Sequence, residues 1–499
     1  MRGFVILLGD DFGIEALSPY GVGGGTGGGG MEYPTMTNVA ALATGGWRAP
    51  KCYAQQLCSP TRATLLTGAY PFRHGVGDLV RPDFEAPATQ AALPETYLTL
   101  PETMLAAGYR TACFGKWHVG NTTVGGKLSP QRAGFETYAG NLHNLTAQNP
   151  SDPAADLLGF TSGESYYDYM LVRNGETTRG FQFYTTYLAN LAIDWIRQRR
   201  ARGEDFLLYL PWYAAHTPLS VPPSTHFRTA EWGAAPYGAA GVPTVDVAIS
   251  KAMIEAVDFE IGRVLEAVDY ATDTVFFLTD NGTATGNLDD GAGNFEYNPA
   301  KSEAYAPYLT LPSTLREYHG KDSPFETGVR VPLIVRGAGV TVAGDTVAAT
   351  TDLYSVADIY PTIVALAGLT MPTTHTFDGL SFKGRLDATS YTPRTTVYTE
   401  WFTPNGPNTG DSYGNRKITN GTYALIRGIN DGGANGGGVP GSQYGDVQTS
   451  TGFARLYNLD DDWQELTNLT PAGDGSELAG ADLAAYQELD AAMAALLVS

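Results

Sequence analysis

Short apolar runs alternate with helical patterns along most of the chain. Each apolar run is compact and is bounded by Gly, Asp or Pro, which is typical of a strand that is buried on both faces. The predicted strands are Phe4–Leu8, Tyr109–Phe114, Phe206–Leu210, Thr274–Thr279 and Val331–Val335. Between them, apolar residues recur at helical spacing within 188–196 and 254–265, and 103–107 is predicted to end a further helix at Gly108. Because strands and helices alternate, we predict an α/β fold in which a mostly parallel sheet is sandwiched by helices.

The pattern changes after Gly368. Turn residues become frequent, and the strand-like pieces are short, such as Thr396–Glu400 and Tyr423–Arg427. A closing helix is predicted from apolar residues that share one face, namely Leu483, Tyr486, Leu489, Met493 and Leu496. We therefore predict two domains: a larger one over residues 1–375, and a smaller α+β domain over residues 376–499 with a short antiparallel sheet.

Composition narrows the functional classes. Of the 499 residues, 31 are Lys or Arg and 52 are Asp or Glu, so the formal net charge is −21 at pH 7. This charge argues against nucleic acid or an anionic membrane as a partner, and no run approaches the ~20 apolar residues that span a bilayer. The run Phe4–Leu8 is also shorter than the roughly 7–15 residues of a signal-peptide core. If the chain is complete at its first residue, we therefore expect a cytoplasmic protein.

Two of the predicted strands end in acidic residues. Asp10-Asp11 follows the first strand, and Asp280-Asn281 follows the strand Thr274–Thr279. Either pair alone is typical of an ordinary turn, but in an open parallel sheet ligands bind beyond the carboxyl ends of the strands. Carboxylates brought together there repel one another unless a cation neutralises them. All-oxygen ligands favour Ca²⁺ or Mg²⁺ over zinc or copper, so the pairing predicts a site for a hard divalent cation.

Cys58 begins the most informative segment of the chain. Three cysteines, Cys52, Cys58 and Cys113, are too few for a disulfide framework, and the first and last are predicted to be packed thiols. Cys58-x-Pro60-x-Arg62, followed by Leu66-Thr67-Gly68, resembles the motif of the sulfatase family, in which the cysteine is oxidised after translation to Cα-formylglycine.

The likeness extends in order along nearly the whole chain. The matching segments are Gly115-Lys116-Trp117-His118-Val119-Gly120, the two acidic pairs, His216-Thr217-Pro218, Lys321 with 326–332, and the late segments 456–460 and 465–469. Thr61 and Thr327 depart from the family pattern, and neither departure removes a reactive group. Lys301 competes with Lys321 for one position, and we prefer Lys321 because the Arg-Val-Pro block that follows anchors it. The glycine-rich segment Gly21–Gly30 has no ordinary counterpart and is expected to border the substrate entrance.

The resemblance implies an alkaline-phosphatase-like fold, with residues 1–375 as the catalytic domain, and hydrolysis of a sulfate ester, as in arylsulfatases. It implies one cation, Ca²⁺ with Mg²⁺ left open, held by Asp10, Asp11, Asp280, Asn281 and the oxidised Cys58. It assigns His118 as the base that helps the sulfated intermediate break down, and His216 and Lys321 to sulfate binding and protonation of the leaving oxygen. Arg62 steadies the formylglycine, and Lys116 adds positive charge beside the sulfuryl oxygens. The implied partners are a small-molecule or carbohydrate sulfate ester and, transiently, a formylglycine-generating or maturase enzyme.

Two other functions remain open from the sequence. A phosphonate monoester or phosphodiester hydrolase of the same superfamily shares the fold, the cysteine motif and the metal site. An unmodified, non-catalytic cation-binding homologue would keep the scaffold without turnover. Among the other histidines, His74 is expected to be supportive, whereas His143, His226, His319 and His375 carry no predicted role.

Overall fold

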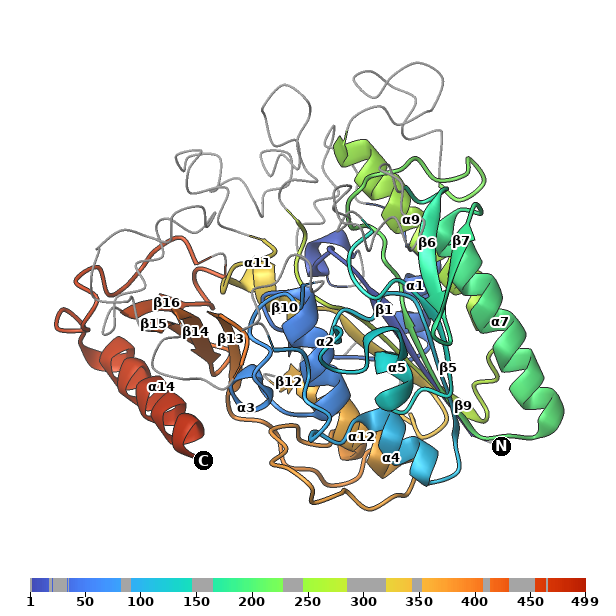
Figure 1. Cartoon of the computed structure of the whole chain (residues 1–499). Helices are drawn as coiled ribbons and strands as arrows, with labels where there is room; N and C mark the ends of the chain where they lie inside the picture. Colours follow the sequence, from blue (N-terminus) through green and yellow to red (C-terminus); the bar gives the residue numbers. More distant parts are fainter. Residues whose placement is uncertain are drawn as a thin grey trace.

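The computed structural model describes residues 2–17, 20, 34, 36–81, 91–145, 165–227, 246–284, 320–342, 352–406, 413–429, 454–463 and 465–499. Its large sheet has nine strands in the order β2-β11-β9-β1-β8-β4-β5-β6-β7 (Figure 1). In chain order these strands are β1 (Gly3–Gly9), β2 (Trp47–Arg48), β4 (Arg110–Phe114), β5 (Thr137–Gly140), β6 (Tyr169–Arg173), β7 (Glu176–Gly180), β8 (Phe206–Pro211), β9 (Asp273–Thr279) and β11 (Leu333–Gly337). The α/β fold predicted from the sequence is confirmed.

The parallel part of the sheet is its centre. The five strands β9-β1-β8-β4-β5 run parallel to one another. At the two margins β11 and β2, and β6 and β7, pair antiparallel, which the sequence analysis did not predict. The connection between β6 and β7 is Asn174-Gly175, with φ of 48° and 89°, and such a two-residue Asn-Gly loop is a strong hairpin signal.

Pro332 divides the predicted strand Val331–Val335 into two pieces. Before it, β10 (Arg330–Val331) joins a three-stranded sheet with β3 (Lys51–Tyr53) and β12 (Leu353–Ser355). After it, β11 pairs with β9 in the large sheet. Proline has no N–H to donate to a ladder, so a change of sheet at this residue is physically reasonable.

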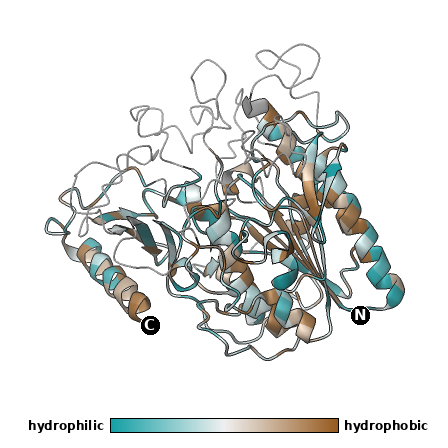
Figure 2. Cartoon of the chain, in the orientation of Figure 1, coloured by the Kyte–Doolittle hydropathy of each residue, from teal (hydrophilic) through white to brown (hydrophobic). Residues whose placement is uncertain are grey.

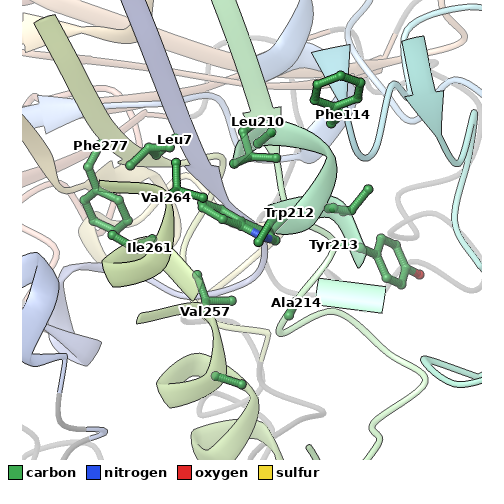
Figure 3. Packing of buried hydrophobic residues seen from close by; sticks show 14 of the residues in the cluster. Leu7, Phe114, Leu210, Trp212, Tyr213, Ala214, Val257, Ile261, Val264 and Phe277 are labelled. Carbon is green, nitrogen blue, oxygen red and sulfur yellow. The ribbon is translucent and has the colours of Figure 1, made fainter. Parts of the chain in front are cut away.

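Helices cover both faces of the large sheet, and β1 shows how. Its alternate residues point to opposite faces, so Val5 and Leu7 pack in one core while Phe4, Ile6 and Leu8 pack in the other. Helices α1 (Thr37–Thr44), α7 (Tyr184–Arg202) and α9 (Asp246–Leu265) contribute to the first core, and α2 (Cys58–Thr67), α4 (Leu100–Ala106) and α12 (Ile359–Leu366) to the second. Figure 3 shows the first core, where α9 lays Val257, Ile261 and Val264 against Leu7 and Phe277.

Shorter elements connect these layers. They are the helices α3 (Pro71–His74), α5 (Ser129–Arg132), α11 (Glu326–Val329) and α13 (Lys383–Leu386), and the 3-10 turns η1 (Ile14–Ala16), η3 (Gly126–Leu128) and η8 (Val356–Asp358).

A separate four-stranded antiparallel sheet and a long helix form the C-terminal part, as predicted (Figure 1). The elements are β13 (Val397–Thr403), β14 (Tyr413–Thr419), β15 (Tyr423–Ile429), β16 (Ala454–Asn458) and α14 (Gly480–Val498). One face of this small sheet packs through Leu425 against Leu489 and Met493 of α14. The opposite face packs through Ile426 against Phe325, next to α11. The small sheet is therefore covered on both faces.

The domain boundary near residue 375 stays a prediction. Phe382 and Leu386 still pack in the second core of the large sheet, and the small sheet begins at Val397. Figure 2 shows the brown, apolar central strands and the mixed brown and teal surface of α7, the pattern of a buried sheet covered by amphipathic helices. Among the helices in the described part of the chain, none is both long and apolar enough to cross a bilayer.

Candidate active site

The two acidic strand ends lie side by side. Strands β1 and β9 are parallel neighbours with Gly9 opposite Thr279, so Asp10-Asp11 and Asp280-Asn281 follow at the same edge of the sheet. The Asp11 N–H donates to Asp280 Oδ1 at 3.4 Å, and Asn281 Nδ2 donates to Asp11 Oδ1 at 3.0 Å. All four side chains are buried. The sheet topology therefore brings together the four strand-end residues expected to bind a cation.

Helix α2 delivers Cys58 to the same edge. Leu57 before it is extended, Pro60 lies in the first turn where an N–H is not needed, and Gly68 ends the helix with φ of 66°. Cys58 is the first helical residue and has no exposed surface. Its Sγ lies 3.9 Å from Asp10 Oδ1 and 3.3 Å from the Nζ of Lys116. The cysteine thus faces both a carboxylate and a cation.

Arg62 lies one helical turn after Cys58 and links the two strand ends. Its Nη2 donates to Asp10 Oδ2 at 2.9 Å and to Asp280 Oδ2 at 2.8 Å, and its Nε donates to the same Asp280 oxygen at 3.1 Å. Its Nη1 donates to the backbone oxygen of Lys116 at 2.7 Å. Because residues four apart share a helix face, the Cys-x-Pro-x-Arg spacing aims both functional side chains at one point.

Two lysines complete the charge balance. Lys116 Nζ lies 2.7 Å from Asp10 Oδ2, and Lys321 Nζ lies 2.7 Å from Asp11 Oδ1. The carboxylates of Asp10, Asp11 and Asp280 thus face the cations of Arg62, Lys116 and Lys321, and the formal charges of these six side chains cancel. A bound divalent cation would leave a net positive site, which is suited to an anionic substrate.

Burial and neighbouring charges shift the pKa values in this site. Burial by itself raises the pKa of Asp11, but Lys321 and Lys116 outweigh it and the pKa is lowered. Burial, reinforced by Asp10, raises the pKa of Asp280 in spite of Arg62. Burial raises the pKa of the Cys58 thiol to about 12, even though Lys116 opposes it. The thiol is therefore protonated at neutral pH, and an unmodified Cys58 is a poor nucleophile.

The two predicted histidines are neutral. Burial, reinforced by the charges of Lys321 and Lys116, lowers the pKa of His216 well below its usual value. His216 Nδ1 lies 2.8 Å from the backbone oxygen of Thr217, which only accepts hydrogen bonds, so we assign the proton to Nδ1. The Nε2 lone pair then faces the site, 3.7 Å from Asp11 Oδ2.

His118 is also buried, and burial with the charge of Lys116 lowers its pKa well below the usual value. Within the described residues its Nδ1 has no hydrogen-bond partner. Both His118 and Asp11 adopt φ of 62°, a left-handed conformation that is uncommon for residues with side chains and is concentrated at functional sites.

The side chains gathered at this sheet edge could hold a metal ion. Ligand atoms of Asp10, Asp11, Cys58 and His216 all lie within 4.8 Å of one another. Asn281 Oδ1 is buried and, among the described residues, has no hydrogen-bond partner. A buried acceptor without a donor is costly, and a cation would satisfy it. His216, predicted as a catalytic residue, thus lies in the same group as the predicted cation ligands.

Tyr213 is a site residue that the sequence analysis did not single out. Its hydroxyl lies 2.9 Å from His216 Nδ1 and donates to the Thr217 backbone oxygen at 2.6 Å. Its ring lies 5.1 Å from the Nζ of Lys116. The signal was its place three residues before His216, directly after a buried strand.

Of two further histidines, His143 borders the site and His74 contacts helix α2. The ring of His143, to which no role was assigned, lies edge-on to His118 at 6.1 Å. His74 Nε2 lies 3.4 Å from Thr64 Oγ1 of α2, and its Nδ1 accepts from the Val76 N–H. Lys301, His319 and Gly21–Gly30, which were also considered, lie outside the described residues.

Comparison with known proteins adds independent evidence. A family model described as Sulfatase matches residues 2–369. N-acetylgalactosamine-6-sulfatase from Homo sapiens is 29% identical over 390 residues, which cover 76% of this chain and 64% of the relative. Arylsulfatase A from Bos taurus is 28% identical over 407 residues, which cover 79% of this chain and 69% of the relative. The chain therefore spans 64% of the length of the human relative and 69% of that of the bovine one.

Solved structures share the fold. The structure of Ps i-CgsB in complex with k-i-k-neocarrahexaose superposes with a TM-score of 0.67 at 20% identity, covering 99% of this chain and 92% of that one. BT4656, solved in complex with its substrate D-glucosamine-2-N,6-O-disulfate, gives a TM-score of 0.62 at 16% identity, covering 99% and 97%. The expected alkaline-phosphatase-like fold is confirmed.

Proposed function

The chain belongs to the sulfatase family, and we propose that it hydrolyses a sulfate ester at the buried centre around Cys58. One observation carries the proposal. Cys58 is held at a sheet edge beside Asp10 and Lys116, and Arg62 joins that edge to Asp280. This is an arrangement of fixed opposite charges around one reactive position, and it offers preorganised electrostatic stabilisation for a transferring sulfuryl group.

Oxidation of Cys58 to formylglycine is part of the proposal. The protonated thiol is a poor nucleophile, because burial raises its pKa to about 12. The hydrated aldehyde supplies two hydroxyls on one carbon, one to attack sulfur and one whose deprotonation later expels sulfate. A formylglycine-generating or maturase enzyme is the partner that this step requires.

We also propose a cation, Ca²⁺ in preference to Mg²⁺. The residues that would hold it are Asp10, Asp11, Asp280 and Asn281, with the oxidised side chain at position 58. The buried Asn281 Oδ1, which has no hydrogen-bond donor in the described part of the chain, supports this set. When bound, the cation supplies Lewis-acid polarisation of oxygen.

The basic side chains bind and orient the substrate. Lys116, 3.3 Å from Cys58 Sγ, places positive charge beside the reacting position. Lys321 is less buried than Lys116, with 12% of its side chain exposed, so it is the lysine that an entering sulfate meets at the site edge. Arg62 holds two carboxylates at a fixed separation and so keeps the site from spreading under their repulsion.

His216 and His118 are proposed to move protons. In the free site His216 is neutral, because burial and two lysines depress its pKa. A sulfate group placed beside it raises that pKa, because a negative neighbour favours the charged imidazole. The imidazole then takes up a proton, which it can give to the leaving oxygen. His118 is neutral and its buried Nδ1 has no hydrogen-bond partner among the residues that the structure describes, so it is suited to accept a proton.

The substrate class we propose is a small-molecule or carbohydrate sulfate ester. Support comes from two structural neighbours: Ps i-CgsB was solved in complex with k-i-k-neocarrahexaose, and BT4656 in complex with its substrate D-glucosamine-2-N,6-O-disulfate.

Parallel rate measurements test the proposal. The protein, produced with a formylglycine-generating enzyme and supplied with Ca²⁺, is assayed on 4-nitrophenyl sulfate and on an aryl phosphonate monoester, and the mass of the Cys58 peptide is measured. We expect sulfate turnover, an aldehyde mass at position 58, and no turnover by a folded Cys58→Ala variant. A strong preference for the phosphonate, or an intact thiol without turnover, would replace this function by one of the two alternatives. Wild-type rates from Cys58→Ala would refute the mechanism.

A further inference from the structure

Three buried charged side chains join the small C-terminal sheet to the segment that carries Lys321. Lys417 of β14 places its Nζ 2.9 Å from Glu326 Oε1 and 2.8 Å from Glu465 Oε1. The backbone N–H of Glu326 also donates to the Glu465 carboxylate. The three side chains are at most 2% exposed. We call Glu326, Lys417 and Glu465 the charged clamp.

Through Glu326 the clamp holds α11, a helix that carries no catalytic group of the proposed site. Apolar contacts reinforce it on either side: Phe325 packs with Tyr457 of the small sheet at a ring-centroid distance of 6.0 Å, and Val329 packs with Val397 of β13. A buried ion network is weak evidence for stability, since its desolvation cost offsets much of its attraction. The role of this network is better explained by the position of α11 that it fixes relative to the small sheet.

Helix α11 in turn contacts residues next to the candidate active site. The Gly282 N–H donates to the Gly328 backbone oxygen of α11 at 2.9 Å, and a Cβ at Gly282 would lie 1.8 Å from the Thr327 oxygen. Gly282 follows Asn281, so the end of β9 rests against α11 with no space between them. Before α11 in the chain, the Lys321 N–H donates to the Thr283 backbone oxygen at 3.0 Å. Asn281 and Lys321 are therefore both tied to a segment that the small sheet holds.

We infer that Lys417 and Glu465 are positioning residues that set Asn281 and Lys321 in register with Asp11. The small sheet is then a working part of the site. Without the Glu465 carboxylate, the Glu326 N–H loses its acceptor and Lys417 holds α11 by one ion pair alone. The segment 320–328 then shifts, and with it the ammonium that lies 2.7 Å from Asp11 Oδ1. The effect on rate rests on the proposed function, whereas the positioning itself does not.

The first test needs no turnover. Hydrogen–deuterium exchange is measured, with Ca²⁺ in the buffer, on peptides that contain the amides of Gly282 and Lys321. Glu465→Ala is compared with Glu400→Ala, since Glu400 is likewise a fully buried glutamate of the small sheet region but accepts from the Phe72 N–H, away from α11. We expect both amides to exchange about ten- to a hundredfold faster in Glu465→Ala only. Unchanged exchange, or the same acceleration in Glu400→Ala, would overturn the inference.

The second test places the effect at Lys321. We expect Glu465→Ala to lower kcat by about ten- to a hundredfold in the wild-type background, but by a factor several times smaller when Lys321→Ala is already present, because only the part that acts through Asn281 then remains. Equal losses in both backgrounds would show a merely structural role and overturn the inference. If Glu465→Ala does not fold, Glu465→Gln and Glu400→Gln take the same two tests, with smaller effects of the same pattern. An inactive wild type would refute the proposed function and leave the exchange result to decide the positioning.

Discussion

Replacing Arg62 by Met removes the guanidinium that Asp10 and Asp280 share. Its Nη2 lies 2.9 Å and 2.8 Å from these two carboxylates, and neither they nor Arg62 have exposed surface. Met fills much of the same volume, so the substitution mainly deletes charge. The five charged side chains that remain in the site then carry three negative and two positive charges, and Asp280 is left with no cation at hydrogen-bond distance among the described residues.

The burial of these side chains sets how much the free energy of unfolding decreases. Breaking a buried ion pair by removing one partner costs about 3–5 kcal/mol, because the remaining charge is desolvated and uncompensated. Arg62→Lys keeps the charge but not the fork that spans two carboxylates, so we expect a smaller loss of about 1–2 kcal/mol. A bound divalent cation neutralises the same carboxylates, so the loss from Arg62→Met is expected to be smaller with Ca²⁺ than with chelator.

Urea denaturation followed by tryptophan fluorescence, in chelator and in Ca²⁺, measures these losses. Arg132→Met is the matched control: the same substitution removes an arginine whose ion pair with Glu95 is more than half exposed, and exposed pairs contribute only about 0–1 kcal/mol. A loss from Arg62→Met in chelator no larger than that of Arg132→Met would refute the reasoning. An equal loss with and without Ca²⁺ would refute the link to a cation.

Three other predictions follow from the site and the small sheet. Tyr213→Phe removes the hydroxyl that lies 2.9 Å from His216 Nδ1, and we expect kcat to fall about tenfold with KM within about twofold; steady-state kinetics would contradict this if KM rose instead. Dialysis against EDTA is expected to abolish hydrolysis and added Ca²⁺ to restore it more fully than Mg²⁺; undiminished rates after dialysis would contradict the cation site. Burial raises the pKa of Glu400 from 4.5 to about 7, so the folded state binds this proton more tightly and stability decreases as pH rises across that window. As the pH rises from 4.5 to 8, the free energy of unfolding of Glu400→Gln should therefore increase by about 2–3 kcal/mol relative to that of the wild type. Denaturation midpoints of the two proteins that change equally across this range would contradict it.

Much of the fold was predictable because buried strands have a local signature. The run Phe4–Leu8 is apolar at every position, since β1 is buried on both faces, and its alternate residues enter two different cores. The margins of the sheet were harder to predict. The pair β6 and β7 carries polar and exposed positions, so its apolar pattern is weak, and only the Asn174-Gly175 turn marks it.

In the candidate site, too, the locally determined features were predictable and the long-range ones were not. Cys58 and Arg62 were predictable together because one helical turn separates them, and local geometry then fixes their relation. That Arg62 spans Asp10 and Asp280, which are 270 residues apart in the chain, depends on β1 and β9 being neighbours, and no local pattern specifies which parallel strands pair. Tyr213 was not singled out because one tyrosine beside a strand is ordinary in a sequence with 29 of them.

What the amino-acid sequence determined alone is therefore the chemistry available: a cysteine at a helix start, acidic residues at strand ends, and basic residues in separate motifs. Each of these is set by contacts within a few residues, where periodicity and turn chemistry act. The tertiary structure decided which charges neutralise one another, and it placed Lys417 and Glu465 of the C-terminal part against Glu326. Such pairings join positions far apart in the chain, and they form only when long-range packing excludes water and places each buried charge against an opposite one.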